Sequence, residues 1–569
     1  MSDAYREDHT SLSPSQEGEL AHKMLGQMGI SVVSEAEFAA MPKAPVAPAI
    51  KPVASRYTII VPLKGKKAIA FNSRSHNFVI FGPKELKRWK KLEEGGYANL
   101  SHPDLMVFAH LGFVVPEGTN ELDLVRQEYW HHRNDKSSMG ITIAPTLGCN
   151  MACSYCFQGL DKPTKKMTAE VLDQLVAFTE RRMEGVNHLN ITWYGGEPLM
   201  DKKAIYTLSD RFMTMCAARG AQYSATIVTN GFLLDRTCAE ELAKRNVSTV
   251  QITIDGYGEA HDKARPLTSG KGSYERILAH IASFIDDVPL SIAIRVNVTV
   301  ENAPVLQRML EDFVARGLAG KPNFSVYFAP VEAATAETET VEAAMLGKVA
   351  YAKVELELTR YAIEHKLITA PRAPSYMGLC VAPRENGFVV APNGELHKCW
   401  DTIQNTRKKV GTIFDEANLF QTDESKMWQA WDPFDNPVCS SCKIAPMCAG
   451  FCQHKFLYPE ETRGEMGALP CPPWKFNVGE YLFLRAEEAK LVKRADWDDE
   501  QATHLKWHGG FRHTRESMEN ANATVKERVT RGDFGAPKQS CDAGGCGCKT
   551  GTSCAPEVSV MAHPTASCG

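Results

Sequence analysis

Hydrophobic positions between residues 141 and 331 repeat in a strand-then-helix order. Apolar runs and alternations predict strands at 141–145, 189–196, 222–231, 247–256, 290–300 and 323–331. Amphipathic stretches such as 168–185 and 303–317 predict helices between them. This pattern predicts an α/β fold with about six parallel strands, either an open barrel or a doubly wound sheet. In both architectures ligands bind at the C-terminal ends of the strands.

A different pattern precedes this repeat. Residues 14–40 favour a short amphipathic helix, and the Pro/Ala-rich stretch 42–55 is typical of an extended linker. Strand patterns at 56–63, 67–72 and 76–81 are followed by a helix pattern at 83–94 that begins with proline. We therefore expect folded structure to begin near Arg56, with a small α+β module over 56–136.

The complete chain is too long for one ordinary core. At 569 residues it is expected to contain about three or four folded units. We predict these divisions: 1–55 helix and linker, 56–136 module, 137–337 strand–helix repeat, 338–378 helical bridge, 379–490 cysteine-rich domain and 491–569 C-terminal extension.

Charge and hydropathy argue against some partners. The formal net charge is −4, and no Lys/Arg run suggests a nucleic-acid-binding face. The first residues are polar and acidic, and no stretch of about 18 apolar residues follows. We expect a cytoplasmic protein that binds neither nucleic acid nor membrane.

Cysteine spacing carries the clearest chemical signal. Disulfides are not expected in a large chain without an export signal, so metal ligation is the leading explanation for 17 cysteines. Eleven of them fall in three short clusters, at 149–156, 439–452 and 541–554. Cys216 and Cys238 lie in helical patterns and are interpreted as ordinary helix residues.

The first cluster directly follows the first strand of the repeat. Cys149, Cys153 and Cys156 have C-x3-C-x2-C spacing, which suits three corners of a [4Fe–4S] cube and leaves the fourth iron open. A zinc knuckle would usually need a fourth Cys or His nearby, and this loop offers none. The loop resembles that of the radical S-adenosylmethionine (SAM) superfamily.

This resemblance implies a partial (β/α)6 TIM-like barrel, with SAM chelating the open iron. It also implies that an electron, from a donor such as flavodoxin or ferredoxin, cleaves SAM to methionine and a 5′-deoxyadenosyl radical that removes a substrate hydrogen atom. The three cysteines would then be ligands rather than nucleophiles, and no catalytic residue is identified.

Polar and glycine residues gather at the ends of the later strands. Gly195, Gly196, Glu197 and Pro198 resemble the family's GGEP motif, which implies a contact with the SAM ammonium group. Other candidates at strand ends are Thr229–Gly231, Thr253–Gly256, His261, Asp262, Arg265, Arg295 and Asn297. The resemblance implies SAM contacts from Tyr155, Thr253, Asn297 and Arg276, with Arg265 as the rival arginine. For each residue alone, turn capping or a surface salt bridge fits equally well.

A second cysteine region lies between residues 380 and 471. Its spacing is C-x13-G-x4-C, then C-x2-C-x5-C-x3-C, then a final cysteine. It resembles the SPASM extension of radical SAM maturases. The resemblance implies one auxiliary [4Fe–4S] cluster on Cys380, Cys399 and Cys452 and another on Cys439, Cys442, Cys448 and Cys471. Two zinc sites are the alternative, and the fourth ligand of the three-cysteine set is left open.

The C-terminal tail has its own cysteines, Cys541, Cys546, Cys548, Cys554 and Cys568, in a Gly/Ser/Thr-rich stretch too poor in large apolar residues to form a core. We expect it to be flexible without metal. It could bind another metal, protect a cluster or mimic a cysteine-rich substrate.

The leading functional prediction is a maturase that installs a thioether or carbon–carbon crosslink in a ribosomally made peptide. The module at 56–136 resembles a winged-helix-like element that binds a peptide leader by strand addition, although a packing role fits the pattern equally well. The alternative enzyme is an anaerobic sulfatase-type maturase that forms formylglycine. That family has an acidic residue directly after the second SPASM cysteine, whereas here Trp400 follows Cys399 and Asp401 comes next. The alternative from another class is a noncatalytic iron–sulfur electron carrier or scaffold.

Overall fold

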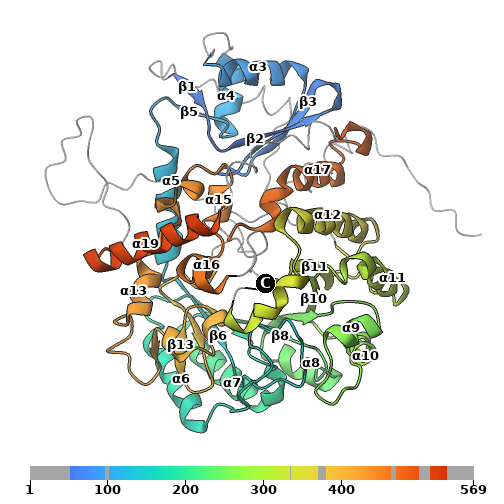
Figure 1. Ribbon diagram of the computed structural model, residues 1–569, viewed down its shortest axis with the longest axis vertical. Coiled ribbons are helices and arrows are strands. Elements are labelled where there is room, and N and C mark those ends of the chain that lie inside the picture. Colours follow the sequence, from blue (N-terminus) through green and yellow to red (C-terminus); the bar gives the residue numbers. More distant parts are fainter. Residues whose placement is uncertain are drawn as a thin grey trace, which may run out of the picture.

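The computed structural model describes residues 51–95, 102–333, 335–368, 380–462, 470–498 and 513–534. The helix expected at 14–40 and the five tail cysteines lie outside the described residues. Figure 1 shows the N-terminal module at one end of the molecule and the strand–helix repeat at the other. Within the described part of the chain, no helix is both long and apolar enough to cross a bilayer.

The predicted strand–helix repeat is confirmed. Its six parallel strands lie in sequence order across the sheet: β6 (Ser138–Ile143), β7 (His188–Trp193), β8 (Gln222–Thr229), β9 (Val247–Thr253), β10 (Ser291–Val298) and β11 (Phe324–Pro330). The connecting helices are α6 (Ala169–Arg181), α7 (Lys202–Arg219), α8 (Arg236–Ala243), α9 (Glu259–Ala264), α10 (Tyr274–Phe284) and α11 (Leu306–Ala315). This is the architecture of a partial (β/α)6 TIM-like barrel, as expected.

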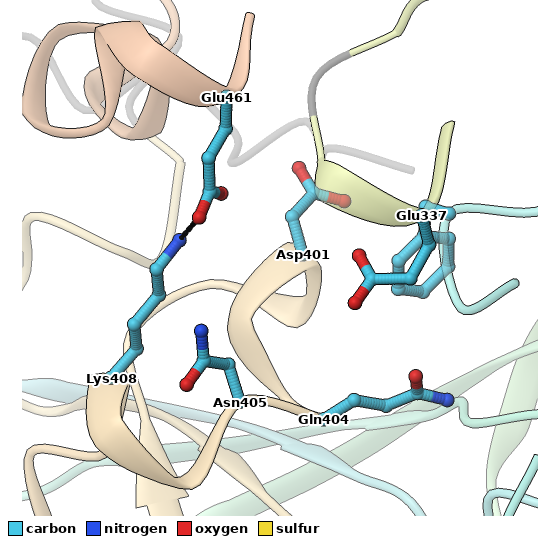
Figure 2. A pocket seen from close by; sticks show the side chains of 7 residues that line it. Glu337, Asp401, Gln404, Asn405, Lys408 and Glu461 are labelled. Atoms are coloured by element: carbon cyan, nitrogen blue, oxygen red, sulfur yellow. Dashed lines mark ion pairs between the residues drawn. The ribbon is translucent and has the colours of Figure 1, made fainter. Parts of the chain in front are cut away.

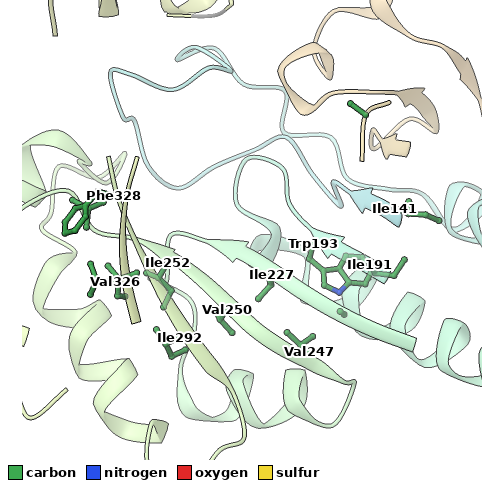
Figure 3. Packing of buried hydrophobic residues seen from close by; sticks show 14 of the residues in the cluster. Ile141, Ile191, Trp193, Ile227, Val247, Val250, Ile252, Ile292, Val326 and Phe328 are labelled. Atoms are coloured by element: carbon green, nitrogen blue, oxygen red, sulfur yellow. The ribbon is translucent and has the colours of Figure 1, made fainter. Parts of the chain in front are cut away.

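The core of the repeat lies along this sheet. Ile191, Ile227, Val250 and Ile292 are fully or almost fully buried on successive strands (Figure 3). Along these strands buried apolar residues alternate with less buried and more polar ones, so one face of the sheet carries the apolar core. The packing fixes the strand ends, and hence the loops that follow them, relative to one another.

The sheet does not stop at the repeat. Strand β12 (Gly387–Val390) pairs in parallel with β6, and β13 (Glu395–His397) and β14 (Gly411–Thr412) continue antiparallel. Nine strands therefore form one sheet within the described residues. The exposed backbone groups of β6 explain this extension, since an edge strand readily accepts another strand. As a result, Cys399 lies just two residues after a strand of the same sheet that carries the first cysteine loop.

The N-terminal module contains the three predicted strands, β2 (Thr58–Leu63), β3 (Lys67–Asn72) and β4 (Phe78–Phe81), which form an antiparallel sheet. The predicted helix is α3 (Pro83–Glu93), and α4 (His102–His110) and α5 (Glu121–Asn134) follow. The structure differs at the expected linker, because β1 (Pro52–Ala54) already pairs with β5 (Val114–Pro116). Backbone pairing there orders residues that composition alone suggested were a spacer.

The module docks on the cysteine-rich region. Arg56 Nη2 donates to the Ser440 carbonyl at 2.7 Å, and Lys443 Nζ donates to the Thr58 carbonyl at 3.0 Å. Ser440 and Lys443 flank Cys442. The module is therefore built against the loop that carries part of the second cysteine set.

The remaining helices and the short 3₁₀ turns complete the described part of the chain. The stretch expected to form a helical bridge contains η5 (Ala336–Ala344) and α12 (Lys348–Glu364). The later α-helices are α13 (Asp423–Ala430), α14 (Pro437–Ser440), α15 (Ala445–Cys448), α16 (Gln453–Leu457), α17 (Val478–Glu488) and α19 (Arg515–Arg531). The short 3₁₀ turns are η1 (Lys64–Lys66), η3 (Pro198–Asp201), η4 (Ala303–Val305), η6 (Trp400–Thr402), η7 (Thr406–Lys408), η8 (Pro433–Asp435), η9 (Pro459–Glu461), η10 (Pro473–Phe476) and η11 (Arg494–Asp496). Helix α19, from the C-terminal extension, contacts α13 and α16 (Figure 1).

Candidate functional site

The first three cysteines lie in the loop that follows β6. Cys153 is buried, and Cys149 and Cys156 are partly buried. The pKa of the Cys149 thiol is raised to about 11, chiefly by burial and to a lesser extent by Glu197 and Cys153. Burial likewise raises the pKa of Cys153, as does Cys156. One buried and two partly buried thiols in a single loop suit a cationic metal cluster, which stabilises thiolates.

The GGEP segment packs directly against this cysteine loop. Glu197 N donates to the Gly148 carbonyl at 2.8 Å, and Gly196 N donates to the Thr146 carbonyl at 3.2 Å. A Cβ at position 196 would lie 2.2 Å from the carbonyl oxygens of both Leu147 and Gly148. Glycine is required here because two backbone segments meet with no room for a side chain.

The Glu197 carboxylate is fully buried and receives three hydrogen bonds. Thr229 Oγ1 and the Leu199 backbone N–H donate to Oε1 at 2.7 and 2.9 Å, and the Asn230 backbone N–H donates to Oε2 at 2.8 Å. Burial raises its pKa, whereas these donors lower it. The carboxylate therefore ties the end of β8 to the turn after β7, and its remaining lone pairs leave it able to accept another donor.

Tyr155, from the cysteine loop, lies in a buried polar network with residues from two strand ends. Its hydroxyl accepts from Arg265 Nη1 at 2.5 Å and from Asn297 Nδ2 at 3.3 Å, and it donates to the Asp255 carboxylate. Asp255 also accepts from the Asn297 backbone N–H at 2.7 Å. Thr253 ends the adjacent strand β9 and is buried.

The two rival arginines have different environments. Arg265 is 8% exposed and belongs to the Tyr155 network. Arg276 lies on the exposed side of α10, with its guanidinium 4.2 Å from the centre of the Phe232 ring. The structure therefore brings Tyr155, Asn297 and Arg265 together, and Arg276 lies apart from that network.

Other strand-end candidates make local contacts. His261 Nδ1 accepts from the Asp255 backbone N–H at 3.2 Å, and Asp262 accepts from the backbone N–H groups of Ser273 and Tyr274. Arg295 Nε donates to Asn297 Oδ1 at 2.9 Å. For His261 and Asp262 the turn-capping interpretation accounts for these contacts.

Several buried donors around the cysteine loop have no partner among the described residues: Asn150 Nδ2, Gln158 Nε2 and Arg265 Nε. Buried polar atoms are normally paired, so each such atom requires an explanation. A ligand rich in acceptors, such as a carboxylate or the sulfides of a cluster, would satisfy them. The donor set at this end of the sheet thus fits SAM and a [4Fe–4S] cluster.

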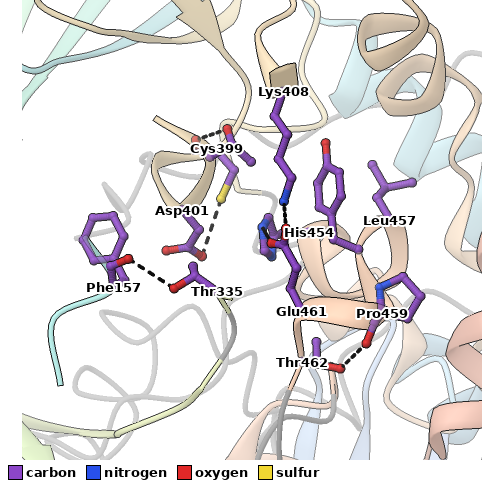
Figure 4. Close-up of polar contacts among 12 residues, drawn as sticks. Phe157, Thr335, Cys399, Asp401, Lys408, His454, Leu457, Pro459, Glu461 and Thr462 are labelled. Atoms are coloured by element: carbon purple, nitrogen blue, oxygen red, sulfur yellow. Dashed lines mark hydrogen bonds and ion pairs between the residues drawn. The ribbon is translucent and has the colours of Figure 1, made fainter. Parts of the chain in front are cut away.

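The second group of cysteines lies beside this rim. Burial raises the pKa of Cys399, and Asp401, Cys452 and Cys380 raise it further. Cys380 and Cys452, the other two cysteines of that predicted set, therefore lie close enough to Cys399 to act on it electrostatically. Cys399 Sγ lies 3.7 Å from Asp401 Oδ2 (Figure 4).

A polar pocket adjoins these cysteines and the cysteine loop of the repeat. Its walls are Phe157, Glu337, Asp401, Gln404, Asn405, Lys408 and Glu461 (Figure 2). Phe157 follows Cys156 directly, and Asp401 lies two residues after Cys399. Lys408 forms an ion pair with Glu461 across the pocket. The pocket is therefore walled by both cysteine regions.

An aromatic stack also joins the two regions. Tyr194, which precedes Gly195, stacks on Phe157 with ring centres 6.0 Å apart and on Trp400 at 5.3 Å. Trp400 directly follows Cys399 and is 41% exposed. This exposed ring beside the pocket offers a surface for an apolar substrate group.

The four remaining cysteines of the region gather at one cavity. Cys439, Cys442, Cys448 and Cys471 all line it, together with Lys475 and His513. Burial raises the pKa of Cys439, and Cys448, Cys471 and Cys442 raise it further. The structure thus assembles the second predicted set as well. Among the described side chains, no group of three or more His, Cys, Asp or Glu is placed to hold a single metal ion; cluster ligands differ because each thiolate binds its own iron.

Some residues at these sites were not identified from the sequence. Asn150, Gln158 and His513 have no motif that marks them, and only the fold brings them to the cysteines. Lys455 is also new: it is 2% exposed and donates to Glu332 Oε2 at 2.8 Å. Its position three residues after Cys452 was the only available signal. Cys216 and Cys238 are buried in α7 and α8, as expected.

Comparison with known proteins gives three informative similarities. The chain is 24% identical over 318 residues to a serine-type anaerobic sulfatase-maturating enzyme of Klebsiella aerogenes, covering 53% of this chain and 76% of the relative. A solved structure of anSMEcpe with bound AdoMet has 20% identity and a TM-score of 0.48, covering 63% of this chain and 98% of that chain. A structure of Streptococcus suis SuiB bound to S-adenosylmethionine has 14% identity and a TM-score of 0.44, covering 73% of this chain and 100% of that chain.

The family comparison coincides with the first site. Residues 143–302 match the radical SAM superfamily. This range contains the loop with Cys149, Cys153 and Cys156, the GGEP segment and the Tyr155 network. The chain therefore contains a radical SAM domain at residues 143–302.

Proposed function

We propose that this radical SAM enzyme is a SPASM-type maturase that crosslinks a ribosomally made peptide. One observation carries the proposal: a single polar pocket is walled by Phe157, next to the first cysteine loop, and by Asp401, next to Cys399. A substrate in this pocket would contact both cysteine regions. That arrangement suits a reaction in which hydrogen removal and bond formation occur at neighbouring places.

Each cysteine set has a proposed cofactor. Cys149, Cys153 and Cys156 would hold the cluster that binds SAM. Two auxiliary [4Fe–4S] clusters would be held by Cys380, Cys399 and Cys452 and by Cys439, Cys442, Cys448 and Cys471. When bound, SAM and its cluster supply one-electron chemistry that removes a hydrogen atom from carbon. The protein supplies binding, orientation and exclusion of water.

The residues of the chain have distinct roles around SAM. The backbone of Gly195 and Gly196 keeps the space beside the cysteine loop free of side chains. Arg265 presents a buried cation with one unpaired N–H, which suits the SAM carboxylate. Tyr155 and Asn297 hold that guanidinium in place through the Tyr155 hydroxyl. We propose Arg265 rather than Arg276 as the SAM-contacting arginine, and Glu197 as the acceptor for the ammonium group.

The N-terminal module is proposed to bind the leader of the peptide. Strand β4 lies at the edge of the β2–β3–β4 sheet, where an extended peptide can add as a further strand. The contacts of Arg56 and Lys443 attach this module to the cysteine-rich region. A leader bound there would hold its core peptide close to the pocket and raise its effective concentration.

The test uses anaerobically reconstituted enzyme with dithionite, SAM and peptides encoded by short reading frames beside its gene. We expect 5′-deoxyadenosine to form together with a peptide that has lost two hydrogen atoms. Asp401→Asn should lower peptide product while SAM cleavage continues, since Asp401 lines the pocket. Asp423→Asn is the control, because its side chain is 96% exposed on α13. SAM cleavage with no change in any peptide would contradict the proposal.

A sulfatase-type maturase is the second candidate. The specific observations are the similarity to the Klebsiella aerogenes enzyme and the position of Asp401, 3.7 Å from Cys399 Sγ. The spacing between these two residues differs from that family's pattern by one position. Incubation with a sulfatase-derived peptide containing Ser or Cys separates the candidates, since formylglycine reacts with a hydrazide probe and a crosslink does not.

A further inference from the structure

His513 is a buried histidine of the C-terminal extension that reaches the second cysteine set. It lies two residues before the start of α19, next to the N-cap Thr514, and is 2% exposed. Its Nε2 atom lies 3.2 Å from Cys439 Sγ, and its Nδ1 atom lies 3.0 Å from Ser517 Oγ. The Phe456 ring packs edge-on against the imidazole, with ring centres 4.8 Å apart. Both ring nitrogens thus have defined partners.

The chemistry of an iron-bound thiolate decides which nitrogen carries the proton. Such a thiolate has no proton and only accepts hydrogen bonds, so Nε2 must donate to Cys439. Nδ1 must then accept from the Ser517 hydroxyl. That hydroxyl also lies 2.9 Å from the Thr514 carbonyl and accepts from the Thr514 backbone N–H at 2.9 Å. Turning its single proton toward Nδ1 selects the required tautomer of His513.

A second buried donor faces the same cavity. Lys475 Nζ lies 3.6 Å from Cys471 Sγ, and Lys475 is 2% exposed. His513 and Lys475 both line the cavity formed by the four cysteines. Donors to the sulfur ligands favour the more negative, reduced state of an iron–sulfur cluster and so raise its reduction potential.

We propose that His513 is a positioning residue for the auxiliary cluster on Cys439, Cys442, Cys448 and Cys471, donating a hydrogen bond to Cys439 and raising the reduction potential of that cluster. The inference rests on the proposed ligand set. It gives the C-terminal extension a function: the residue before the N-cap of α19 brings a donor from outside the cysteine-rich segment to the cluster.

The test is an EPR-monitored redox titration of the full chain. Replacing Cys149, Cys153 and Cys156 by Ala leaves only the two auxiliary clusters to contribute. His513→Leu should lower the ratio of reduced to oxidised cluster about tenfold at a fixed potential, which corresponds to about 59 mV for one electron. Only one of the two auxiliary signals should shift. His513→Gln should stay close to the parent protein, because the glutamine amide can donate from a position near that of Nε2.

A matched control perturbs α19 without touching the cluster. Asn522 is buried on α19 and donates from Nδ2 to the Leu457 carbonyl at 2.7 Å. Asn522→Ala should loosen this packing and leave both potentials unchanged. If His513→Leu loses the cluster, Ser517→Ala is measured instead. This variant should lower the reduction potential of the same cluster by a smaller amount.

The outcomes separate the inference from the proposed function. The role of His513 alone would be overturned if each auxiliary signal kept the same reduction potential in the parent, His513→Leu and Ser517→Ala proteins. Protein that contains only one auxiliary cluster, with the Cys439 set binding no iron, would instead refute the proposed ligand assignment. If Asn522→Ala shifts the reduction potential of the same cluster, loosened packing of α19 accounts for the effect. That result would also overturn the inference.

Discussion

Gly196→Ala is the most direct test of how the structure builds the SAM site. The new Cβ would lie 2.2 Å from two backbone carbonyl oxygens of the cysteine loop, whereas ordinary contact begins at 3.4 Å. The loop would have to move by at least about 1.2 Å, because backbone atoms cannot rotate away as a side chain can.

Two effects should follow. Overpacking of this kind costs about 1–3 kcal/mol of folding free energy. A displacement of about 1 Å at a reacting site lowers the rate by about 100-fold. Since the moved segment directly precedes Cys149, we expect Gly196→Ala to lose both cluster retention and SAM cleavage.

The assay compares melting temperature, iron content and 5′-deoxyadenosine formation in the reconstituted protein. Gly140→Ala is the matched control, because it lies in β6 of the same sheet and its Cβ would meet Val381 at an ordinary 3.4 Å. The reasoning is refuted if Gly196→Ala cleaves SAM as well as Gly140→Ala and melts at the same temperature.

Three further predictions concern the metal sites and pH. Cys153→Ala should abolish 5′-deoxyadenosine formation because the cluster would lose one of three ligands, and undiminished cleavage would contradict the assignment. Metal analysis of the reconstituted chain should give about twelve irons in three clusters, since ten cysteines fall into sets of three, three and four; iron for one cluster with zinc elsewhere would refute the auxiliary sites. Burial lowers the pKa of His261 to about 3, below its unfolded value of about 6.5, so the unfolded chain binds more protons between these values. Its stabilising contribution should therefore be complete above about pH 6.5 and fall by about 2 kcal/mol at pH 5, and thermal unfolding of His261→Gln should lack this part of the pH dependence.

The cysteine sets show which metal-ligand groups can be predicted from spacing within one segment and which cannot. The C-x3-C-x2-C loop is one local segment, so its function could be predicted without knowledge of distant residues. The set of Cys380, Cys399 and Cys452 spans more than 70 positions, and only the resemblance to a known extension grouped it. In the structure Cys380 and Cys452 are close enough to Cys399 to affect its ionisation, and the pairing of β12 with β6 brings the strand that precedes Cys399 into the sheet of the first cysteine loop. That pairing was not predicted, because a free strand edge leaves no sign in the sequence of its partner.

The two arginines illustrate a different limit. Arg265 and Arg276 are both candidates from sequence, since each follows the strand that ends at Thr253. Burial distinguishes them: Arg265 lies beneath the cysteine loop beside Tyr155, whereas Arg276 lies on the surface of α10. Side-chain direction on a short helix depends on how that helix packs, which the spacing of one segment does not determine.

By itself, the sequence determined the strand–helix repeat, the cysteine loop and the adjoining glycine motif, because hydrophobic period and ligand spacing act over a few residues. Tertiary structure alone decided that the cysteine-rich region continues the barrel sheet, that Phe157 and Asp401 wall one pocket, and that His513 reaches Cys439. These contacts join residues up to hundreds of positions apart. They depend on which edges and faces remain to be buried after the local elements have formed, and that is settled by packing of the whole chain.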